Sequence, residues 1–265
     1  MNPRQISSRD NPLLLRLRKL ARDPQAYRKL GQVWLEGEHL CSALVARGGR
    51  AVVAVIAESA WSKAADEGAA EADGIMALIA RADDVVIVAD KLFVDFSPLP
   101  SPAGIGFVLD LPAPTPIDAH APTLILDRLQ DAGNVGSILR SAAALGVRQV
   151  LALQGTAGLW SPKVLRAGMG AQFGLRLVEG LGLDDLDALV VPLVATSSHA
   201  SQALPQARLP NPCAWVLGHE GQGVAPALLA RCALTVRIPQ PGGEESLNVA
   251  AAAAICLYES ARRGA

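Results

Sequence analysis

The sequence predicts an α/β protein with two domains, the second of which is built on a parallel β-sheet. The chain has 265 residues, enough for two domains of ordinary size. Of these residues, 51% are hydrophobic, 18% charged and 4% aromatic, a balance that is typical of a compact folded protein and excludes a disordered chain. Short apolar runs alternate with helical patterns, and one proline-rich segment interrupts the alternation near the middle of the chain.

The chain begins with a basic helical pattern. The segment LLLRLRKLARDP, Leu13 to Pro24, spaces leucines and basic residues at near-helical intervals and ends at a proline. Residues 1 to 30 hold eight basic and two acidic residues (8 − 2 = +6), although the whole chain has a net charge of −1. Either direct contact with RNA or a solvated helix packed by its leucines fits this pattern; a membrane-surface helix fits less well. The candidate RNA-binding residues are Arg4, Arg9, Arg16, Arg18 and Lys19.

Alternating elements fill the rest of the first domain. Val33 to Gly48 has the pattern of a strand end, a turn and a helix, and Ala51 to Glu58 that of a buried strand. Asp84 to Ala89 and Gly104 to Leu109 are short β-branched runs bounded by charge, Pro or Gly, and they predict further strands. We therefore expect a small α/β domain over residues 1–110.

A linker separates the two domains. Leu111 to Pro122 contains four prolines in 12 residues, and proline removes a backbone donor and disfavours helix in the residue before it. After this linker, a helix is expected near Val135 to Leu145. Strands are expected at 123–127, 148–153, 190–196, 214–218 and 234–239. Because these strands are almost continuously apolar, the second domain, residues 123–265, is expected to be a parallel sheet covered by helices on both faces.

Neither a membrane span nor a metal site is expected. The longest apolar run, Val249 to Tyr258, is half of the roughly 20 residues that cross a bilayer, and no apolar signal segment follows the first arginines. We expect a cytoplasmic protein with no membrane partner. The cysteines are scattered, without a CxxC pair or a histidine cluster, so they predict buried thiols and no bound metal. They are Cys41, Cys213, Cys232 and Cys256.

Three segments of unusual composition follow apolar strands of the second domain, where open α/β sheets bind their ligands. The first, Leu126 to Val147, places Asn134 near the start of a helix and Arg140 about two turns further on. In a generic α/β protein Asn134 would cap the helix and Arg140 would be a surface charge. The chemistry of this segment therefore depends on its context.

The second and third segments are rich in small residues. Trp215 to Val224 places three glycines around Glu220, and glycine permits close approach of the backbone to a ligand. The spacing G-x-x-G-x-G differs from the dinucleotide fingerprint G-x-G-x-x-G, which weakens the alternative of a nucleotide-binding oxidoreductase. Ile238 to Glu259 joins a Pro/Gly turn to Ser246, Asn248 and a helix of small residues, a composition that favours dense packing.

In this order the three segments resemble the three motifs of the SpoU/TrmH-type ribose 2'-O-methyltransferases of the SPOUT superfamily. Glu36 to Leu40 and Ser101 to Ile105 resemble the small substrate-binding domain of that family, so the similarity covers nearly the whole chain. One departure is alanine, where many relatives have serine or glycine, in the helix after Asn248; we expect it to affect packing only. The motif residues are Asn134, Gly136 and Arg140, then Gly218, Glu220 and Gly223, then Ile238, Pro239, Ser246, Leu247, Asn248 and Val249.

The resemblance implies both a fold and a reaction. A SPOUT catalytic domain with a deep trefoil knot would follow an N-terminal RNA substrate-binding domain related to a ribosomal protein. The reaction would move a methyl group from S-adenosylmethionine to a ribose 2'-hydroxyl of RNA. The implied cofactor-binding residues are Thr196, Gly218, Glu220, Ile238 and Leu247. The implied catalytic residues are Arg140, Asn134, Glu220, Ser246 and Asn248.

Several points stay open at this stage. The family places the motif arginine in the partner's pocket of a homodimer, where Arg140 would act either as a general base or as an anchor for the neighbouring phosphate. We expect Ser246 to hydrogen-bond to Asn134 or Glu220. Ribosomal RNA is favoured over transfer RNA as the substrate, because a separate N-terminal domain carries the basic end. A non-catalytic RNA-binding module of the same fold is the remaining alternative.

Overall fold

The structure is a computed structural model that describes residues 3–67, 74–242 and 246–264. Two compact units make up the chain. The first contains Met1–Ala113 and Trp160–Phe173, and the second contains Pro114–Leu159 and Gly174–Ala265. Residues 160–173 therefore pack with the first unit, although the preceding residues 114–159 belong to the second.

The first unit contains a mixed sheet. Over the described residues its strand order is β1 (Arg4–Ile6), β4 (Ala82–Val88), β3 (Ala51–Ala57), β5 (Ile105–Asp110), β2 (Gln32–Glu36). Strands β1, β4 and β3 run parallel, and β5 is antiparallel to both β3 and β2. The strands expected in this half are confirmed. Strand β1 was not expected, because only one of its three side chains is buried and the segment has no apolar pattern.

Helix α1 shows how the sequence sets the helices of this unit. Its first turn is capped by Asn11, whose Oδ1 accepts a hydrogen bond from the Leu13 N–H at 2.9 Å, and Pro12 follows the cap. Leu14 and Leu17 are fully buried, which confirms that the leucines pack this helix on the core. The helices of the first unit are α1 (Pro12–Arg22), α2 (Ala26–Leu30), α3 (Glu38–Ala46), α4 (Glu58–Glu67), α5 (Ile75–Ile79), α6 (Asp90–Phe96) and α8 (Pro162–Gly168).

The sheet of the second unit is parallel throughout its described strands, as the sequence predicts. Its order is β10 (Gln202–Ala203), β12 (Leu234–Arg237), β9 (Leu193–Thr196), β11 (Ala214–Leu217), β6 (Thr123–Leu126), β7 (Gln149–Leu153), β8 (Arg176–Leu181). The strands β6, β7 and β11 are buried along their whole length. Strand β8 was not expected, because this edge strand mixes polar and apolar residues without a regular pattern and has no fully buried side chain.

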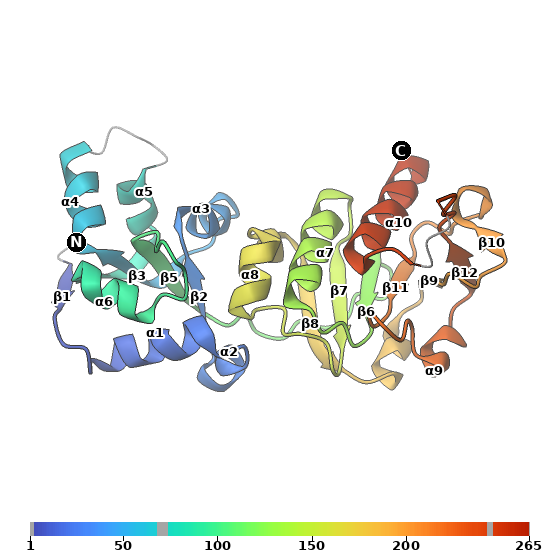
Figure 1. Ribbon diagram of the computed structural model, residues 1–265, viewed down its shortest axis with the longest axis horizontal. Helices are drawn as coiled ribbons and strands as arrows, with labels where there is room; N and C mark the ends of the chain where they lie inside the picture. The colour runs from blue at the N-terminus through green and yellow to red at the C-terminus, as the bar shows by residue number, and fades with distance from the viewer. Residues whose placement is uncertain (1–2, 68–73, 243–245, 265) are drawn as a thin grey trace. The chain divides into compact units, whose positions relative to one another are not determined.

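Two long helices of the second unit lie side by side, α7 (Ala132–Ala144) and α10 (Val249–Gly264) (Figure 1). The small residues of α10 allow this contact, and Ala253 and Cys256 are fully buried in it. Shorter helical elements are α9 (Pro226–Leu229), Asp184–Ala188 and Leu204–Gln206. Residues 243–245, within the third motif, lie outside the described residues, and the trefoil knot stays a prediction.

Three of the four cysteines are buried as expected, and the fourth is an exception. Cys232 is only half-buried, because it lies in the turn after α9, where its thiol donates to the Leu228 carbonyl at 3.4 Å. Across the described ranges, no helix combines the length and the apolar character that a bilayer span requires.

Candidate active site

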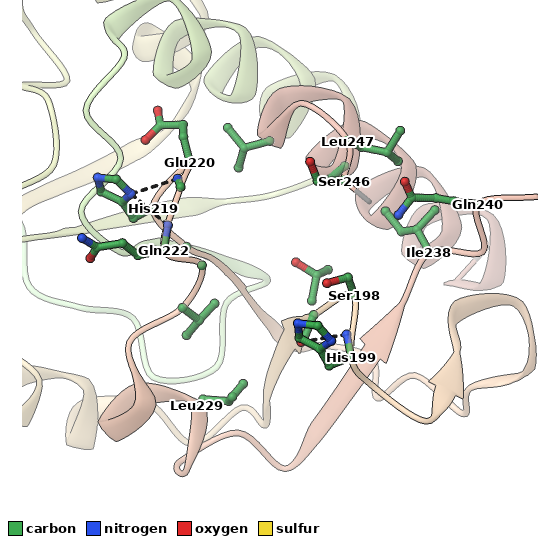
Figure 2. A pocket seen from close by; sticks show the side chains of 18 residues that line it. Ser198, His199, His219, Glu220, Gln222, Leu229, Ile238, Gln240, Ser246 and Leu247 are labelled. Atoms are coloured by element: carbon green, nitrogen blue, oxygen red, sulfur yellow. Dashed lines mark hydrogen bonds between the residues drawn. The ribbon is translucent and has the colours of Figure 1, made fainter. Parts of the chain in front are cut away.

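The carboxyl ends of β9, β11 and β12 open onto a cavity of about 460 Å³ in the second unit. This volume is typical of a small-molecule site. Three segments form its walls: the loop after β9, the glycine-rich loop after β11, and residues Ile238, Gln240, Ser246 and Leu247 between β12 and α10 (Figure 2). The residues expected to bind a cofactor all line the cavity; they are Thr196, Gly218, Glu220, Ile238 and Leu247.

The glycine-rich loop is folded tightly on itself. A Cβ on Gly218 would overlap the backbone of Gly223 and Val224, so only glycine fits there. The Gly223 N–H donates to the His219 carbonyl at 2.8 Å, and Gly223 has a positive φ of 67°. His219 Nδ1 accepts the N–H groups of Gly221 at 3.0 Å and Gln222 at 3.2 Å. His219 and Gln222 were not singled out in the sequence, although they belong to the segment that was.

Glu220 joins this loop to the start of α7. Its carboxylate accepts the backbone N–H groups of Gln130 at 3.2 Å and Asp131 at 3.0 Å, and the Asn134 amide at 3.3 Å. Burial raises the pKa of Glu220, but the N–H groups directed at its carboxylate outweigh burial and lower it below the ordinary value. In Figure 2 the carboxylate points away from Ile238 and Gln240 on the opposite wall. Glu220 therefore fixes the loop as a charged acceptor.

Two asparagines extend this contact to the third motif. The Asn248 amide donates to Asn134 Oδ1 at 3.0 Å, so Glu220, Asn134 and Asn248 form one hydrogen-bonded chain through all three motifs. Asn248 also caps α10, because its Oδ1 accepts the Ala250 N–H at 2.9 Å. The generic interpretation of Asn134 as a helix cap is wrong, since Asp131 caps α7 by accepting the Asn134 N–H at 2.8 Å.

Ser246 lines the cavity without joining this chain. Over the described residues it forms no hydrogen bond with Asn134 or Glu220, and that expectation is not met. Asn134 Oδ1 instead accepts from Asn248, and the Glu220 carboxylate accepts from Gln130 and Asp131, directly before α7.

A charged pair beneath the loop was missed in the sequence. Asp127, at the end of β6, is buried and pairs with Arg128 Nε at 2.9 Å, which raises the pKa of Arg128. Arg128 has a positive φ of 58° and also reaches Gln222 Oε1 at 3.1 Å. The second Asp127 oxygen accepts the Ala225 N–H at 2.7 Å. The Asp-Arg pair thus supports the glycine-rich loop at both ends, yet in the sequence it resembles an ordinary charged strand end.

Arg140 lies outside this cavity. Its side chain is exposed on α7, and within the described part of the chain it has no hydrogen bond or ion pair. The cavity of a single chain therefore does not include the residue that the resemblance places at the centre of the chemistry.

The candidate RNA-binding residues lie in the first unit, and most already contact other side chains. Arg4 pairs with Asp84, Arg9 approaches Asp95 at 3.1 Å, and Arg18 approaches the same carboxylate at 3.9 Å. Arg16 donates to Gln32 at 2.8 Å, whereas Lys19 is exposed on α1. The arginines of the Arg4 and Arg9 pairs are exposed, and such pairs are weak, so an RNA phosphate can compete for these two groups.

Comparisons with known proteins give the same family throughout the chain. A model described as the SpoU rRNA Methylase family matches residues 121–258. An uncharacterized tRNA/rRNA methyltransferase of Synechocystis is 32% identical over 97% of this chain and 93% of its own length. The 23S rRNA (guanosine-2'-O-)-methyltransferase RlmB of Bordetella pertussis is 37% identical over 60% of this chain and 65% of its own length. This chain thus spans slightly less than two thirds of that relative.

Solved structures agree over both units. A TrmH-family putative RNA methyltransferase of Porphyromonas gingivalis is 30% identical, with a TM-score of 0.79 over 96% of this chain and 98% of that one. The AdoMet-bound rRNA methyltransferase of Sinorhizobium meliloti shares the fold, with 24% identity and a TM-score of 0.81 over 98% of each chain. The family model covers more than half of the chain, and the Synechocystis relative matches nearly all of it. This chain therefore belongs to the SpoU rRNA methylase family.

Proposed function

We propose that the chain transfers the methyl group of S-adenosylmethionine to a ribose 2'-hydroxyl of ribosomal RNA. The observation that carries the proposal is the hydrogen-bonded chain of Glu220, Asn134 and Asn248, which joins the first motif to the second and third motifs, whose residues Glu220, Ser246 and Leu247 line the cavity. The 23S rRNA specificity of the Bordetella relative favours ribosomal over transfer RNA. We also propose that the protein is cytoplasmic.

The cavity residues fit S-adenosylmethionine. Gly218, Gly221 and Gly223 have no side chains, so a ligand can contact the backbone in this wall of the cavity. Gln240 also lines the cavity, and its Oε1 is buried without a hydrogen-bond partner among the described residues. An unpaired buried acceptor favours a ligand that donates, such as one with an amino group. Thr196, Ile238 and Leu247 would hold the cofactor together with the glycine-rich loop. When bound, its sulfonium supplies an activated methyl group.

Arg140 has two roles to test. As a general base it would have to lose a proton at neutral pH, which costs on the order of 7 kcal/mol for a pKa above 12. As a charged anchor it would bind the phosphate beside the reacting ribose and orient the 2'-hydroxyl, while phosphate or water takes the proton. In either role we expect Arg140→Ala to abolish methylation.

The variant Arg140→Lys separates the two roles in a pH series. Activity that rises with pH would indicate a true base, because lysine can be deprotonated and arginine hardly can. Absence of activity at every pH, with S-adenosylmethionine binding intact, would indicate that the planar guanidinium geometry is required. Full activity of Arg140→Ala would refute both roles.

We further propose that the site is completed across a homodimer. Ala251, Ile255 and Tyr258 follow helical spacing on the exposed side of α10, and Tyr258 keeps 59% of its surface exposed. Helix α10 lies beside α7, which carries the exposed Arg140. An isologous pairing over this stripe would offer each Arg140 to the cavity of the partner.

Mixing two impaired variants tests this shared site, with the S-adenosylmethionine concentration kept well below the Kd of Gly218→Ala. Arg140→Ala lacks the arginine and Gly218→Ala lacks an open cofactor cavity, so a mixed dimer contains one intact site only if the two groups come from different chains. We expect activity to return on mixing and subunit exchange. A monomer that is active at dilution, or no recovery from verified mixed dimers, would refute the shared site.

The substrate is tested by mapping ribose 2'-O-methyl groups in total RNA from cells with and without the gene. We expect one ribosomal position to be lost and to return with the wild-type gene but not with Arg140→Ala. Loss of a transfer RNA position would correct the substrate. An unchanged map would favour a non-catalytic RNA-binding module.

A further inference from the structure

We propose that the second unit holds a second site, which binds a phosphate group at the edge of the sheet opposite the active-site cavity. A separate cavity of about 520 Å³ lies where β6, β7 and β8 begin, whereas the active-site cavity lies where β9, β11 and β12 end. All these strands are parallel, so the two cavities lie at opposite ends of the strands. One strand length, on the order of 15 Å, separates them.

The floor of this second cavity is rigid. Gln149 is fully buried, and its Oε1 accepts the Asp118 N–H at 2.9 Å. Its amide donates to the Asp118 carbonyl and to Thr123 Oγ1, both at 2.8 Å. The side chain thus fastens the segment before β6 to the start of β7, with all its polar atoms paired. A floor fixed in this way preorganises the groups around it for a ligand.

Two arginines and a histidine line the rim of this floor. Arg148 directly precedes Gln149, and Gln149 pairs with Arg176 across strands β7 and β8. The backbone N–H of Arg176 donates to the Arg148 carbonyl at 3.0 Å, so the two arginines lie on neighbouring strands. Arg176 Nη1 also donates to the Pro116 carbonyl at 2.8 Å, which orients that guanidinium and leaves its other N–H groups available. His120 completes the group.

Ion pairs among the described residues do not neutralise the two arginines of this rim. Within the described ranges neither Arg148 nor Arg176 forms an ion pair. The lining includes one carboxylate, Asp118, whose Oδ1 accepts the His120 N–H at 3.1 Å. Counting histidine as neutral, two arginines and one aspartate give the lining a net charge of 2 − 1 = +1. Residues 31–265, which contain this lining, have a net charge of −1 − 6 = −7.

A phosphate group fits this site best. The fork of N–H groups on a guanidinium matches the oxygens of phosphate, and two exposed guanidinium groups over one cavity allow contact from two sides. We assign the phosphate to the backbone of the RNA substrate, an assignment that rests on the proposed function. Double-stranded-RNA-binding domains span about 16 base pairs, a length well above the roughly 15 Å between the two cavities, so a structured RNA at the active site can extend to the second cavity.

The double variant Arg148→Gln, Arg176→Gln tests the site in the full-length chain. Arg208→Gln is the control for each single variant, Arg148→Gln and Arg176→Gln, which remove the same single charge, because Arg208 is exposed, lines neither cavity and has no hydrogen bond among the described residues. Binding of a ribosomal RNA transcript that carries the mapped nucleotide is measured over a range of salt concentrations. We expect the double variant to bind about tenfold more weakly, and the slope of log K against log salt to fall by about 0.7 to 0.9.

Two further measurements locate the cause. S-adenosylmethionine affinity, and kcat at saturating RNA, should match those of the wild type, since the loss concerns RNA binding alone. Equal RNA affinity and equal salt slope in the double variant and the Arg208→Gln control would overturn the proposal. A titration with inorganic phosphate, followed by the arginine side-chain NMR signals, covers the other source: binding there with unchanged RNA affinity would overturn the RNA assignment.

Failure of the proposed function would look different. The wild-type chain would then leave every RNA unmethylated. The phosphate titration, compared between the wild type and the double variant, would still decide whether the second cavity binds an anion.

Discussion

A single added methyl group at position 218 should close the active-site cavity. A Cβ on Gly218 would overlap the carbonyl of Gly223 and the backbone nitrogen of Val224, and backbone atoms cannot rotate aside as a flexible side chain does. Gly221, in the same loop, is a matched control, because the nearest atom to its added Cβ is His219 Cε1 at 3.8 Å, an ordinary contact. The two substitutions add the same group to one loop, with and without a collision.

The size of the effect follows from the cost of overpacking. Forcing an extra carbon against fixed neighbours costs about 1 to 3 kcal/mol. The loop that has to move is a wall of the cavity, so this strain falls largely on cofactor binding. Because about 1.4 kcal/mol corresponds to a tenfold change in Kd, we expect Gly218→Ala to weaken S-adenosylmethionine binding by about 10- to 100-fold. Gly221→Ala should change the Kd by less than about twofold.

Isothermal titration calorimetry with S-adenosylmethionine gives the Kd of each variant, and thermal unfolding checks that both remain folded. A Gly218→Ala protein that binds within twofold of the wild type would refute the packing explanation. Equal losses in Gly218→Ala and Gly221→Ala would also refute it, because the loop would then be sensitive to any side chain.

Three further predictions concern the contacts around the cavity and the C-terminal helix. Asn248→Asp keeps the acceptor that caps α10 but loses the donor to Asn134, so thermal stability should hold while turnover falls; Asn248→Ala should also lose about 1 kcal/mol of stability. Arg128→Ala leaves the buried Asp127 without its cation, so the free energy of unfolding should fall by about 1 to 2 kcal/mol. Cofactor binding should also weaken, because the contact from Arg128 to Gln222 in the glycine-rich loop is lost; an unchanged Tm would contradict this prediction. Hydrogen bonds from Arg262 and Arg263 lower the pKa of Glu259 to about 2, so its stabilising contribution is present above pH 4.5 and disappears as the pH falls toward 2. Denaturation of Glu259→Gln should therefore differ from that of the wild type more at pH 6 than at pH 3.

The fold was predictable where local pattern and burial coincide. Strands β6, β7 and β11 are buried on every residue, and their apolar runs marked them in the sequence. Strands β1 and β8 could not be predicted from pattern, since edge pairing holds them and few of their side chains are buried. The docking of residues 160–173 on the first unit is likewise a long-range contact that no local signal in the sequence specifies.

The site residues were predicted through the resemblance of the three motifs, and the structure gives a physical reason for two of them. Gly218 has to be glycine because of a backbone overlap, and Asn248 has both a donor and an acceptor in use. Arg128 was missed because its hydrogen-bond partner in the glycine-rich loop, Gln222, is 94 residues away in the sequence. Asn134 was an expected partner of Ser246, but in the structure Asn134 Oδ1 accepts from Asn248. No pattern in the sequence distinguishes these two pairings.

The remaining question is where the proton of the attacking hydroxyl goes. Among the described side chains that line the cavity, the titratable ones are Glu220, His219 and His199. Glu220 has a lowered pKa and accepts three N–H groups, so it is a poor base. His219 accepts two N–H groups at Nδ1, which places its own proton on Nε2 and leaves that nitrogen a donor.

His199 is then the single titratable side chain of that lining whose ring is uncommitted. It lies in the exposed loop after β9, whereas the motif arginine is the group expected to meet the ribose. We therefore expect His199→Asn to keep kcat within about threefold and Arg140→Ala to lose it, since a general base contributes roughly 100-fold or more. A loss of that size in His199→Asn, together with loss of the acidic limb of the pH profile, would move the base to His199 and leave Arg140 as the phosphate anchor.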